Sequence, residues 1–236
     1  MARQDTIRIF IPSYKRARQV TELRELPECK IVIPESQLKD YVEFYPKEQL
    51  LSIDDSLDGS HPRKMNALLD LCETGDKIMM IDDDVEYIKR INGNKLTIPE
   101  IYGLIEQGFQ LIEDLGIHYW GLGWDIQQLH FDKSKPFGFG SSFFSQFVGV
   151  IKSDLRFDEN IRPSDTDFWL QNTRQDKMTF CFKHYFAKAK VKCKNQTGGI
   201  ETKEDSSADF NYLYKKWGNK VLKKTNTSII PVSPYV

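Results

Sequence analysis

The residues Lys77-Ile78-Met79-Met80-Ile81-Asp82-Asp83-Asp84 join an apolar run to three consecutive carboxylates. A fully apolar run of this length predicts a strand that is buried inside a sheet. In open parallel sheets, ligands bind beyond the carboxyl ends of the strands, and the aspartates follow such an end directly. An exposed acidic turn has the same composition, so the triplet gains meaning from its neighbours along the chain. We expect a ligand site at the end of this strand.

Further strands and helices alternate on both sides of this run. Short β-favouring runs are stopped by Pro12 and by Pro34, and a stretch with helical character follows each of them. Residues 120–140 are rich in glycine and aromatic residues and lack either period, which indicates a binding loop. The expected strands are residues 7–11, 30–33, 50–53, 78–81, 147–151 and 178–182, and the expected helices are residues 16–26, 35–45, 61–73, 98–115, 164–174 and 208–218.

This alternation predicts an α/β fold. Strands joined by helical crossovers would form a mostly parallel, Rossmann-like sheet flanked by helices, with a smaller β/α extension at the C-terminus. A chain of 236 residues with 40% hydrophobic residues is long enough to bury one substantial core. We therefore expect residues 1–236 to form a single domain.

Charge is distributed unevenly along the chain. The whole sequence has a formal net charge of −1, but residues 181–224 contain 11 lysines and no arginine against four acidic residues. The rest of the chain is therefore acidic. A total near zero argues against a nonspecific nucleic-acid binder, while the asymmetry suggests that one face meets a polyanion and another holds cations.

The cysteines and the N-terminus favour a cytosolic protein. The four cysteines are scattered in mixed surroundings, which in a reducing compartment indicates buried thiols rather than disulfides. A zinc site at Cys181, His184 and Cys193 would lack a fourth ligand at a regular spacing. The opening residues contain no apolar run of signal-peptide length, and no later stretch approaches the roughly 20 apolar residues of a membrane span.

Three adjacent carboxylates repel one another unless cations or hydrogen-bond donors surround them. A divalent Mg²⁺ or Mn²⁺ that bridges a diphosphate would relieve this repulsion, because these hard cations combine one or two carboxylates with phosphate oxygens. Two other enzyme classes have related patterns. A phosphatase of the haloacid-dehalogenase type usually has Thr or Val where this chain has Glu86, and a sugar nucleotidyltransferase has a glycine-rich phosphate loop that is missing after Ile11.

Ordered segments of the chain resemble the landmarks of GT-A glycosyltransferases. The series spans roughly residues 7–171, and the correct order is harder to obtain by chance than any single landmark. The segments are Ile9-Phe10-Ile11-Pro12-Ser13-Tyr14-Lys15-Arg16, then Arg63-Lys64-Met65-Asn66, then Ile81-Asp82-Asp83-Asp84, and then Phe157-Asp158-Glu159 followed by Ser164-Asp165-Thr166-Asp167-Phe168.

The resemblance implies a metal-dependent glycosyltransferase that uses a nucleoside-diphosphate sugar, with a UDP-sugar favoured and with Mn²⁺ or Mg²⁺ as the metal. Residues 1–115 would bind this donor, and residues 116–236 would bind the acceptor. By this resemblance the nucleobase and ribose would be bound by Pro12, Ser13, Tyr14 and Arg16, and the ribose or diphosphate would be approached by Arg63, Lys64 and Asn66. The ribose would also contact Asp82 or Asp83. The metal would be held by Asp84 and Asp82.

The resemblance also implies a catalytic base in a later acidic motif, which reads Glu-Asp in inverting members. This chain has Ser164-Asp165 there, so the glutamate is lost and both Asp165 and Asp167 are candidates. An inverting transfer needs a carboxylate within hydrogen-bond reach of the acceptor hydroxyl. N-terminal capping of the following helix is the competing explanation, and it can hold for one of the two aspartates.

The lysines near the C-terminus give a clue to the kind of acceptor. In an extended segment, Lys188, Lys190, Lys192 and Lys194 would project from one face, either as a phosphate-binding ridge or as the protective charges of an edge strand. With this ridge, a small chain without a membrane anchor resembles the TET-associated glycosyltransferases, largely phage enzymes that attach sugars to hydroxymethylated pyrimidines in DNA. The resemblance implies DNA as the acceptor and, for a phage protein, the cytoplasm of the host cell. A glycan or protein acceptor and an inactive DNA-binding module are the alternatives.

Two further groups of residues have a functional and a structural interpretation. His184 would be a third metal ligand or a structural histidine. Aromatic side chains would stack on a base that is flipped out of the duplex, or would pack in the core, which is the commoner role. They are Trp120, Trp124, Phe137, Phe139, Phe143 and Phe144.

Overall fold

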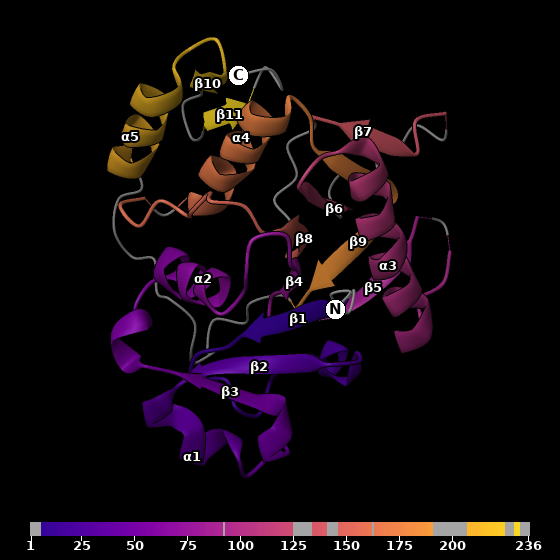
Figure 1. The fold of residues 1–236 in the computed structure, drawn as a ribbon, viewed down its shortest axis with the longest axis vertical. Helices are drawn as coiled ribbons and strands as arrows, with labels where there is room; N and C mark the ends of the chain where they lie inside the picture. Colours follow the sequence, from indigo (N-terminus) through magenta and orange to yellow (C-terminus); the bar gives the residue numbers. More distant parts are fainter. Residues whose placement is uncertain are drawn as a thin grey trace.

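Strand β4 (Lys77–Ile81) lies in the middle of a nine-stranded sheet, and all of its residues are buried. The computed structural model describes residues 6–91, 93–124, 134–140, 146–161, 163–190, 207–224 and 229–231. In this part of the chain the strand order is β3-β2-β1-β4-β8-β6-β9-β5, with β7 paired to β9 (Figure 1). The prediction that the apolar run before the triplet forms a buried strand is confirmed.

The sheet is mixed and mostly parallel. Strands β1 to β4, β6 and β9 run in one direction, and β5, β7 and β8 run against them. The other strands are β1 (Ile7–Pro12), β2 (Cys29–Pro34), β3 (Leu50–Ile53), β5 (Val85–Arg90), β6 (Tyr119–Trp124), β7 (Phe137–Phe139), β8 (Phe147–Ile151) and β9 (Phe180–Ala189). The helices are α1 (Leu38–Tyr41), α2 (His61–Asp70), α3 (Ile98–Leu115), α4 (Ser164–Asp176) and α5 (Ser207–Trp217), with 3-10 turns at Glu22–Glu25, Glu35–Gln37, Lys47–Gln49 and Asp55–Leu57.

Helices cover both faces of the sheet (Figure 1). Helix α3 packs on one face against Ile9 and Ile11, while α2, α4 and α5 pack on the other face around Phe10. Strand β1 contributes to both cores because successive side chains of a strand point to opposite faces. The predicted α/β class and the flanking helices are confirmed. So is the smaller C-terminal extension, in which α5 is followed by the hairpin of β10 (Leu222–Lys224) and β11 (Ile229–Pro231).

Helix α3 has the bounds that the sequence predicts. It begins after Thr97, whose backbone N–H donates to the Glu100 carboxylate at 2.8 Å, and Pro99 stands in its first turn. It ends at Gly116, which has a left-handed φ of 65°. These are ordinary start and stop signals of a helix, so its length could be taken from the sequence.

The predicted loop at residues 120–140 is wrong in its described parts, because β6 and β7 lie within it. Trp120 on β6 is fully buried between α3 and β8. A Cβ atom at Gly108 of α3 or at Gly149 of β8 would overlap its indole ring. The glycines that suggested a loop therefore make room for a core tryptophan. Phe137 and Phe139 on β7 are about half exposed, and the placement of Phe143, Phe144 and the Trp124 side chain lies outside the described residues.

The predicted helix at residues 16–26 is also wrong, since this segment contains only the turn Glu22–Glu25. Its backbone bonds to other parts of the chain: the Arg16 N–H donates to the Tyr41 hydroxyl at 3.1 Å, and the Thr21 N–H donates to the Asp83 carbonyl at 3.0 Å. Lys15 adopts a positive φ of 54°, which a helix does not allow. The predicted helix at residues 35–45 shrinks to a 3-10 turn and α1.

Two further observations concern the class of protein. No helix in the described segments is long and apolar enough to cross a membrane. Cys29, Cys72 and Cys181 are buried free thiols, as predicted, and Cys193 lies outside the described residues.

Candidate active site

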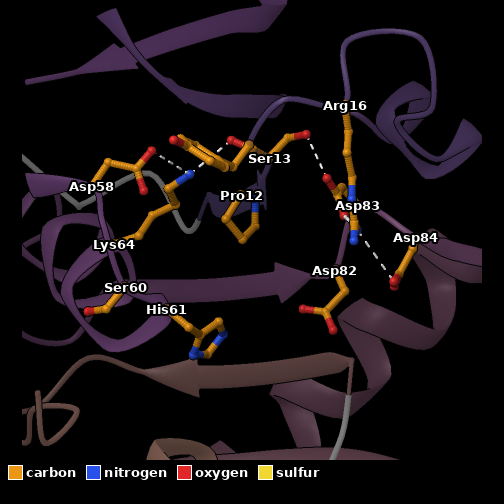
Figure 2. Close-up of a pocket in the computed structure, with 11 residues that line it drawn as sticks. Pro12, Ser13, Arg16, Asp58, Ser60, His61, Lys64, Asp82, Asp83 and Asp84 are labelled. Atoms are coloured by element: carbon orange, nitrogen blue, oxygen red, sulfur yellow. Dashed lines mark hydrogen bonds and ion pairs between the residues drawn. The ribbon is translucent and has the colours of Figure 1, made fainter. Parts of the chain in front are cut away.

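A cavity of about 230 Å³ opens where β1 and β4 end (Figure 2). The triplet contributes all three aspartates to its wall, and the residues after β1 and at the start of α2 complete it. The sequence predicted this convergence, because the carboxyl ends of parallel strands meet at one edge of the sheet. The lining residues are Pro12, Ser13, Tyr14, Arg16, Asp58, Ser60, His61, Lys64, Asp82, Asp83 and Asp84.

The carboxylates of the triplet point in different directions. Asp83 is nearly fully buried, accepts a hydrogen bond from the Ser13 hydroxyl at 2.6 Å, and pairs with the Arg16 guanidinium at 2.6 Å. Asp84 lies 3.5 Å from the same guanidinium. Figure 2 shows the Asp82 carboxylate on the opposite side, toward His61. Asp83 therefore holds the turn after β1 in place, while Asp82 and Asp84 have weaker ties to the protein.

The turn after β1 is fixed by several hydrogen bonds. The Ser13 N–H donates to the Val32 carbonyl at 2.9 Å, which continues the ladder between β1 and β2. The hydroxyl groups of Ser13 and Tyr41 are 2.8 Å apart, and Tyr41 is fully buried. The Lys15 N–H donates to the Gln37 side chain at 2.7 Å. These bonds pre-organise one wall of the cavity.

The cavity is electrostatically unbalanced. Burial raises the pKa of Asp82 to about 7, the neighbouring carboxylates act in the same direction, and the charge of His61 opposes them. Burial also raises the pKa of Asp83, against its hydrogen bonds from Ser13 and Arg16. Carboxylates that are crowded and withdrawn from water favour the arrival of positive charge.

Helix α2 brings a second group of residues to the cavity. The Ser60 hydroxyl accepts a hydrogen bond from the Arg63 N–H at 3.3 Å and caps the helix, as the sequence predicted. Lys64 is buried, pairs with Asp58 at 3.1 Å, and donates to the Ser13 carbonyl at 2.9 Å. Burial lowers the pKa of Lys64, and the charge of Asp58 opposes this shift. Lys64 thereby links α2 to the turn after β1.

The structure does not bring Arg63 and Asn66 to the cavity wall. The Arg63 guanidinium lies 3.6 Å from the Glu159 carboxylate on the exposed surface. The Asn66 side chain exchanges hydrogen bonds with the backbone of Phe157, both 2.9 Å long. Asn66 therefore joins α2 to the segment before α4 instead of meeting a ligand in this cavity.

The two aspartates that were candidates for the base both lie in the first turn of α4, but they differ in exposure. Asp165 is about half exposed, and its carboxylate lies 3.6 Å from Nδ1 of His61. Asp167 is fully buried and accepts hydrogen bonds from Trp217 and Gln171, both 2.7 Å long, and from Lys216 at 3.0 Å. A carboxylate that is enclosed in this way has no path to an acceptor hydroxyl, so this geometry corrects the prediction for Asp167.

The family model of the TET-associated glycosyltransferases matches residues 7–199 of the sequence. The chain belongs to this family. No curated protein matches the sequence.

Among solved structures, the fold of this chain is similar to that of the mannosyltransferase PcManGT from Pyrobaculum calidifontis in complex with GDP-Man and Mn²⁺. The TM-score is 0.52, and the sequence identity is 11%. The similarity covers 75% of this chain and 54% of that chain, so this chain spans about half the length of its structural neighbour. At this identity the likeness concerns the fold.

The donor atoms in the cavity fit a hard divalent cation. Oδ1 of Asp84 is buried without a hydrogen-bond partner among the described residues. All three aspartates offer oxygen, the donor that Mg²⁺ and Mn²⁺ prefer. No group of three or more histidine, cysteine or acidic side chains within the described ranges forms a complete metal site. The remaining ligands would have to come from a substrate or from water.

The lysines predicted to bind nucleic acid are described only in part. Lys188 stands on β9 opposite Tyr87 of β5. The Lys190 N–H donates to the Asp84 carbonyl at 2.8 Å, and its ammonium group donates to the Gln19 carbonyl at 3.4 Å. Lys192 and Lys194 lie outside the described residues. Lys190 is thereby adjacent to the triplet, which its position in the sequence did not suggest.

Sequence reasoning missed four residues of the site, one of which is Ser60, a cavity-lining residue that was predicted only as the cap of α2. His61 and Asp58 line the cavity, and Tyr41 supports its wall from α1. The position of His61 directly after the cap residue Ser60 was a usable signal, because it places His61 at the N-terminal end of α2. Asp58 and Tyr41 are placed by tertiary contacts that no local pattern reveals. His184 lies away from the cavity wall, where its Nδ1 is 3.2 Å from the Pro136 carbonyl.

Proposed function

We propose that this glycosyltransferase uses a divalent metal and a nucleoside-diphosphate sugar to glycosylate a 5-hydroxymethylpyrimidine base in DNA. The observation that carries the proposal is the cavity in which the triplet, the turn after β1 and the start of α2 meet, with a buried Asp84 oxygen that lacks a partner. A cation, a donor from a ligand or an ordered water would satisfy this oxygen.

The donor would occupy this cavity. Ser13 and Tyr14 stand at the β1 end, where the nucleoside of the donor is expected, and Arg16 is held beside the triplet by Asp83. A UDP-sugar is the favoured donor, and Asp82 or Asp83 would contact its ribose. The structural neighbour, whose complex contains GDP-Man and Mn²⁺, supports a nucleotide-sugar donor and a metal. Arg63 and Asn66 do not line the cavity, so we no longer assign them to the donor.

Asp84, together with Asp82, would hold Mn²⁺ or Mg²⁺. When bound, the metal stabilises the leaving nucleoside diphosphate as a Lewis acid. The protein contributes the fixed position of the carboxylates at the end of β4. Arg16 adds the positive charge of a guanidinium, which stays protonated in proteins. Burial lowers the pKa of Arg16, but Asp83 and Asp84 raise it by more.

Asp165 is the base in our proposal. Its carboxylate is accessible and lies 3.6 Å from Nδ1 of His61, which is a residue of the cavity wall. In an inverting transfer it would accept the proton of the acceptor hydroxyl as that oxygen attacks the sugar. The fully buried carboxylate of Asp167 instead binds side chains of α5.

The acceptor surface is supported by a second cavity beside the triplet. This cavity has a volume of about 650 Å³, and its wall includes Val85 and Glu86, which directly follow Asp84. Positive groups outnumber negative ones on its wall, which suits the phosphates of a nucleic acid. They are Arg18, Arg24, Lys95 and Lys190, against Glu22 and Glu86. Of the predicted ridge, Lys190 thus remains in a position to contact DNA, and Lys188, Lys192 and Lys194 stay part of the proposal.

The direct test is a transfer assay with a panel of UDP-hexoses and Mn²⁺, in which DNA with 5-hydroxymethylcytosine is compared with unmodified DNA. We expect the nucleosides of the modified DNA to gain the mass of one hexose with at least one donor. Asp84→Asn should reduce this gain by at least about 100-fold, as is common when a group that stabilises developing charge is lost. Asp154→Asn, which alters an exposed carboxylate away from the cavity, is the control. No mass gain on the modified DNA with any donor would contradict the DNA acceptor.

A further inference from the structure

The N-terminal turn of α4 is tied to helix α5 through one buried carboxylate. Asp167 has no solvent exposure, and both of its oxygens accept hydrogen bonds. The indole of Trp217 donates to Oδ1 at 2.7 Å, and the ammonium group of Lys216 lies 2.9 Å from the same atom. Gln171, one turn further along α4, donates to Oδ2 at 2.7 Å. Two of the three donors therefore come from α5.

The same lysine reaches a second element. Lys216 lies 2.7 Å from Asp158, in the segment that precedes α4. This segment is fastened to α2 by the backbone hydrogen bonds of Phe157 with Asn66, and the Phe157 ring stacks on Phe168 of α4 at 4.0 Å. Lys216 thus joins α5, α4 and the segment before α4 in one network.

Helix α5 lies beyond residue 199, where the match to the family model ends. It is nevertheless part of the core, since Leu213 is buried together with Val221 and Leu222 against the residues of α2 and α4. A loosely attached tail would not bury these side chains. The contact between α5 and α4 is therefore a built part of this chain.

We propose that α5 acts as a clamp on α4, and that Lys216 and Trp217 are positioning residues that hold Asp165 at the edge of the donor cavity. The inference rests on the proposed role of Asp165 as the base. Asp165 stands two residues before Asp167, and no side chain of the N-cap residue Pro163 fixes the first turn. The direction of this turn is therefore set by the bonds to Asp167 from α5, together with the stacking of Phe168 on Phe157 and the contact of His61 with Asp165. A base that is displaced by about 1 Å loses on the order of 100-fold in rate.

The clamp predicts that Lys216→Met and Trp217→Phe lower kcat by at least about tenfold. The KM for the donor should stay within about twofold, because neither residue lines the donor cavity. Lys216→Arg keeps both ion pairs and should restore kcat to within about threefold of the wild type. Lys215→Met removes the neighbouring exposed lysine and is the matched control, which should leave both constants unchanged.

Hydrogen–deuterium exchange of the full-length protein tests the clamp without turnover. In Trp217→Phe the amides of residues 164–167 should exchange at least about tenfold faster, while those of α3 keep their wild-type rates. If Lys216→Met does not fold, Trp217→Phe decides, since it keeps the lysine and most of the ring volume. Unchanged exchange at residues 164–167, or unchanged kcat in folded variants of a working enzyme, would overturn the clamp. Full activity of Asp165→Asn would instead overturn the proposed base, so the two failures are distinguishable.

Discussion

Arg16 is the residue on which the arrangement of the triplet depends. Its guanidinium lies 2.6 Å from Asp83 and 3.5 Å from Asp84, and all three side chains are largely buried. The closer partner also accepts a hydrogen bond from Ser13, so the position of Asp83 is over-determined. Asp84 retains a buried oxygen without a described partner, and it is this asymmetry that leaves one carboxylate available for a ligand.

At this scale we predict that Arg16→Met lowers the free energy of unfolding by about 3–5 kcal/mol, because it leaves the Asp83 carboxylate buried without its counter-charge. The measurement is urea-induced unfolding of the wild type, Arg16→Met, Asp83→Asn and the double variant. The double variant should be less destabilised than the sum of the single variants by at least about 1 kcal/mol. Additive effects would show that the two side chains do not depend on each other.

At the scale of the element, α3 can pack this closely on the sheet because Gly108 has no side chain. A Cβ at Gly108 would overlap the Trp120 indole, whereas a Cβ at Gly103 would have no neighbour within 4 Å. The indole also packs edge-on against Phe109 at 5.7 Å and against Phe182 at 5.7 Å. The helix and strands β6 and β9 are thus fitted together around one ring.

These two glycines give a matched pair of substitutions in one helix. Gly108→Ala should destabilise the protein by about 1–3 kcal/mol, because overpacking outweighs the gain in helix propensity. Gly103→Ala should stabilise it by about 0.5–1 kcal/mol, since the exposed site is open and alanine is the better helix former. Thermal unfolding of both variants measures the difference. Stabilisation by both substitutions would mean that Trp120 does not fill this space.

Elements with their own local signals could be predicted from the sequence. Helix α3 carries start and stop residues, and β8 (Phe147–Ile151) is a plain apolar run, so the bounds of both are as predicted. Strand β5 was not predicted, and neither was the irregular path of residues 16–26. In both, the backbone partners lie far along the chain: β5 pairs with β9, and Thr21 bonds to Asp83. Hydrogen bonds of this kind leave no periodicity in the sequence.

The site shows the same division. The triplet and the residues after β1 could be found because each group follows an apolar strand. The carboxyl ends of parallel strands meet at one edge of the sheet. The burial of Asp167 could not be read from its neighbours, because its partners Lys216 and Trp217 are about 50 residues away on α5. Arg63 and Asn66 lie on the same helix as Lys64, but they face away from the cavity wall, toward Glu159 and Phe157.

At the scale of the whole molecule, two cavities adjoin the triplet. The donor cavity and the larger cavity beside it both lie next to the triplet, and the cations of the latter include Arg18 and Lys190. The Arg18 guanidinium rests over the Phe44 ring at 5.2 Å, which holds its charge in place. Such an arrangement presents phosphate contacts close to the site of sugar transfer.

We predict that Arg18→Ala/Lys190→Ala reduces the salt dependence of DNA binding. Each lost phosphate contact should lower the slope of log K against log salt concentration by roughly 0.9 for duplex DNA, or by roughly 2 for the pair. Fluorescence anisotropy with labelled duplex DNA at several salt concentrations gives the slope. Lys47→Ala/Lys177→Ala serves as the control. These two lysines lie before the amino ends of β3 and β9, whereas the triplet follows the carboxyl end of β4. An equal change in both double variants would remove this cavity as the DNA surface.

The proposed function depends on coupling between metal and nucleotide in the donor cavity. Isothermal titration of UDP into the protein, with and without Mn²⁺, measures this coupling in the absence of an acceptor. We predict that Mn²⁺ tightens UDP binding at least about tenfold in the wild type and in Asp154→Asn, and that Asp84→Asn abolishes the gain. UDP binding that is equally tight without Mn²⁺, or a gain that persists in Asp84→Asn, would contradict the account.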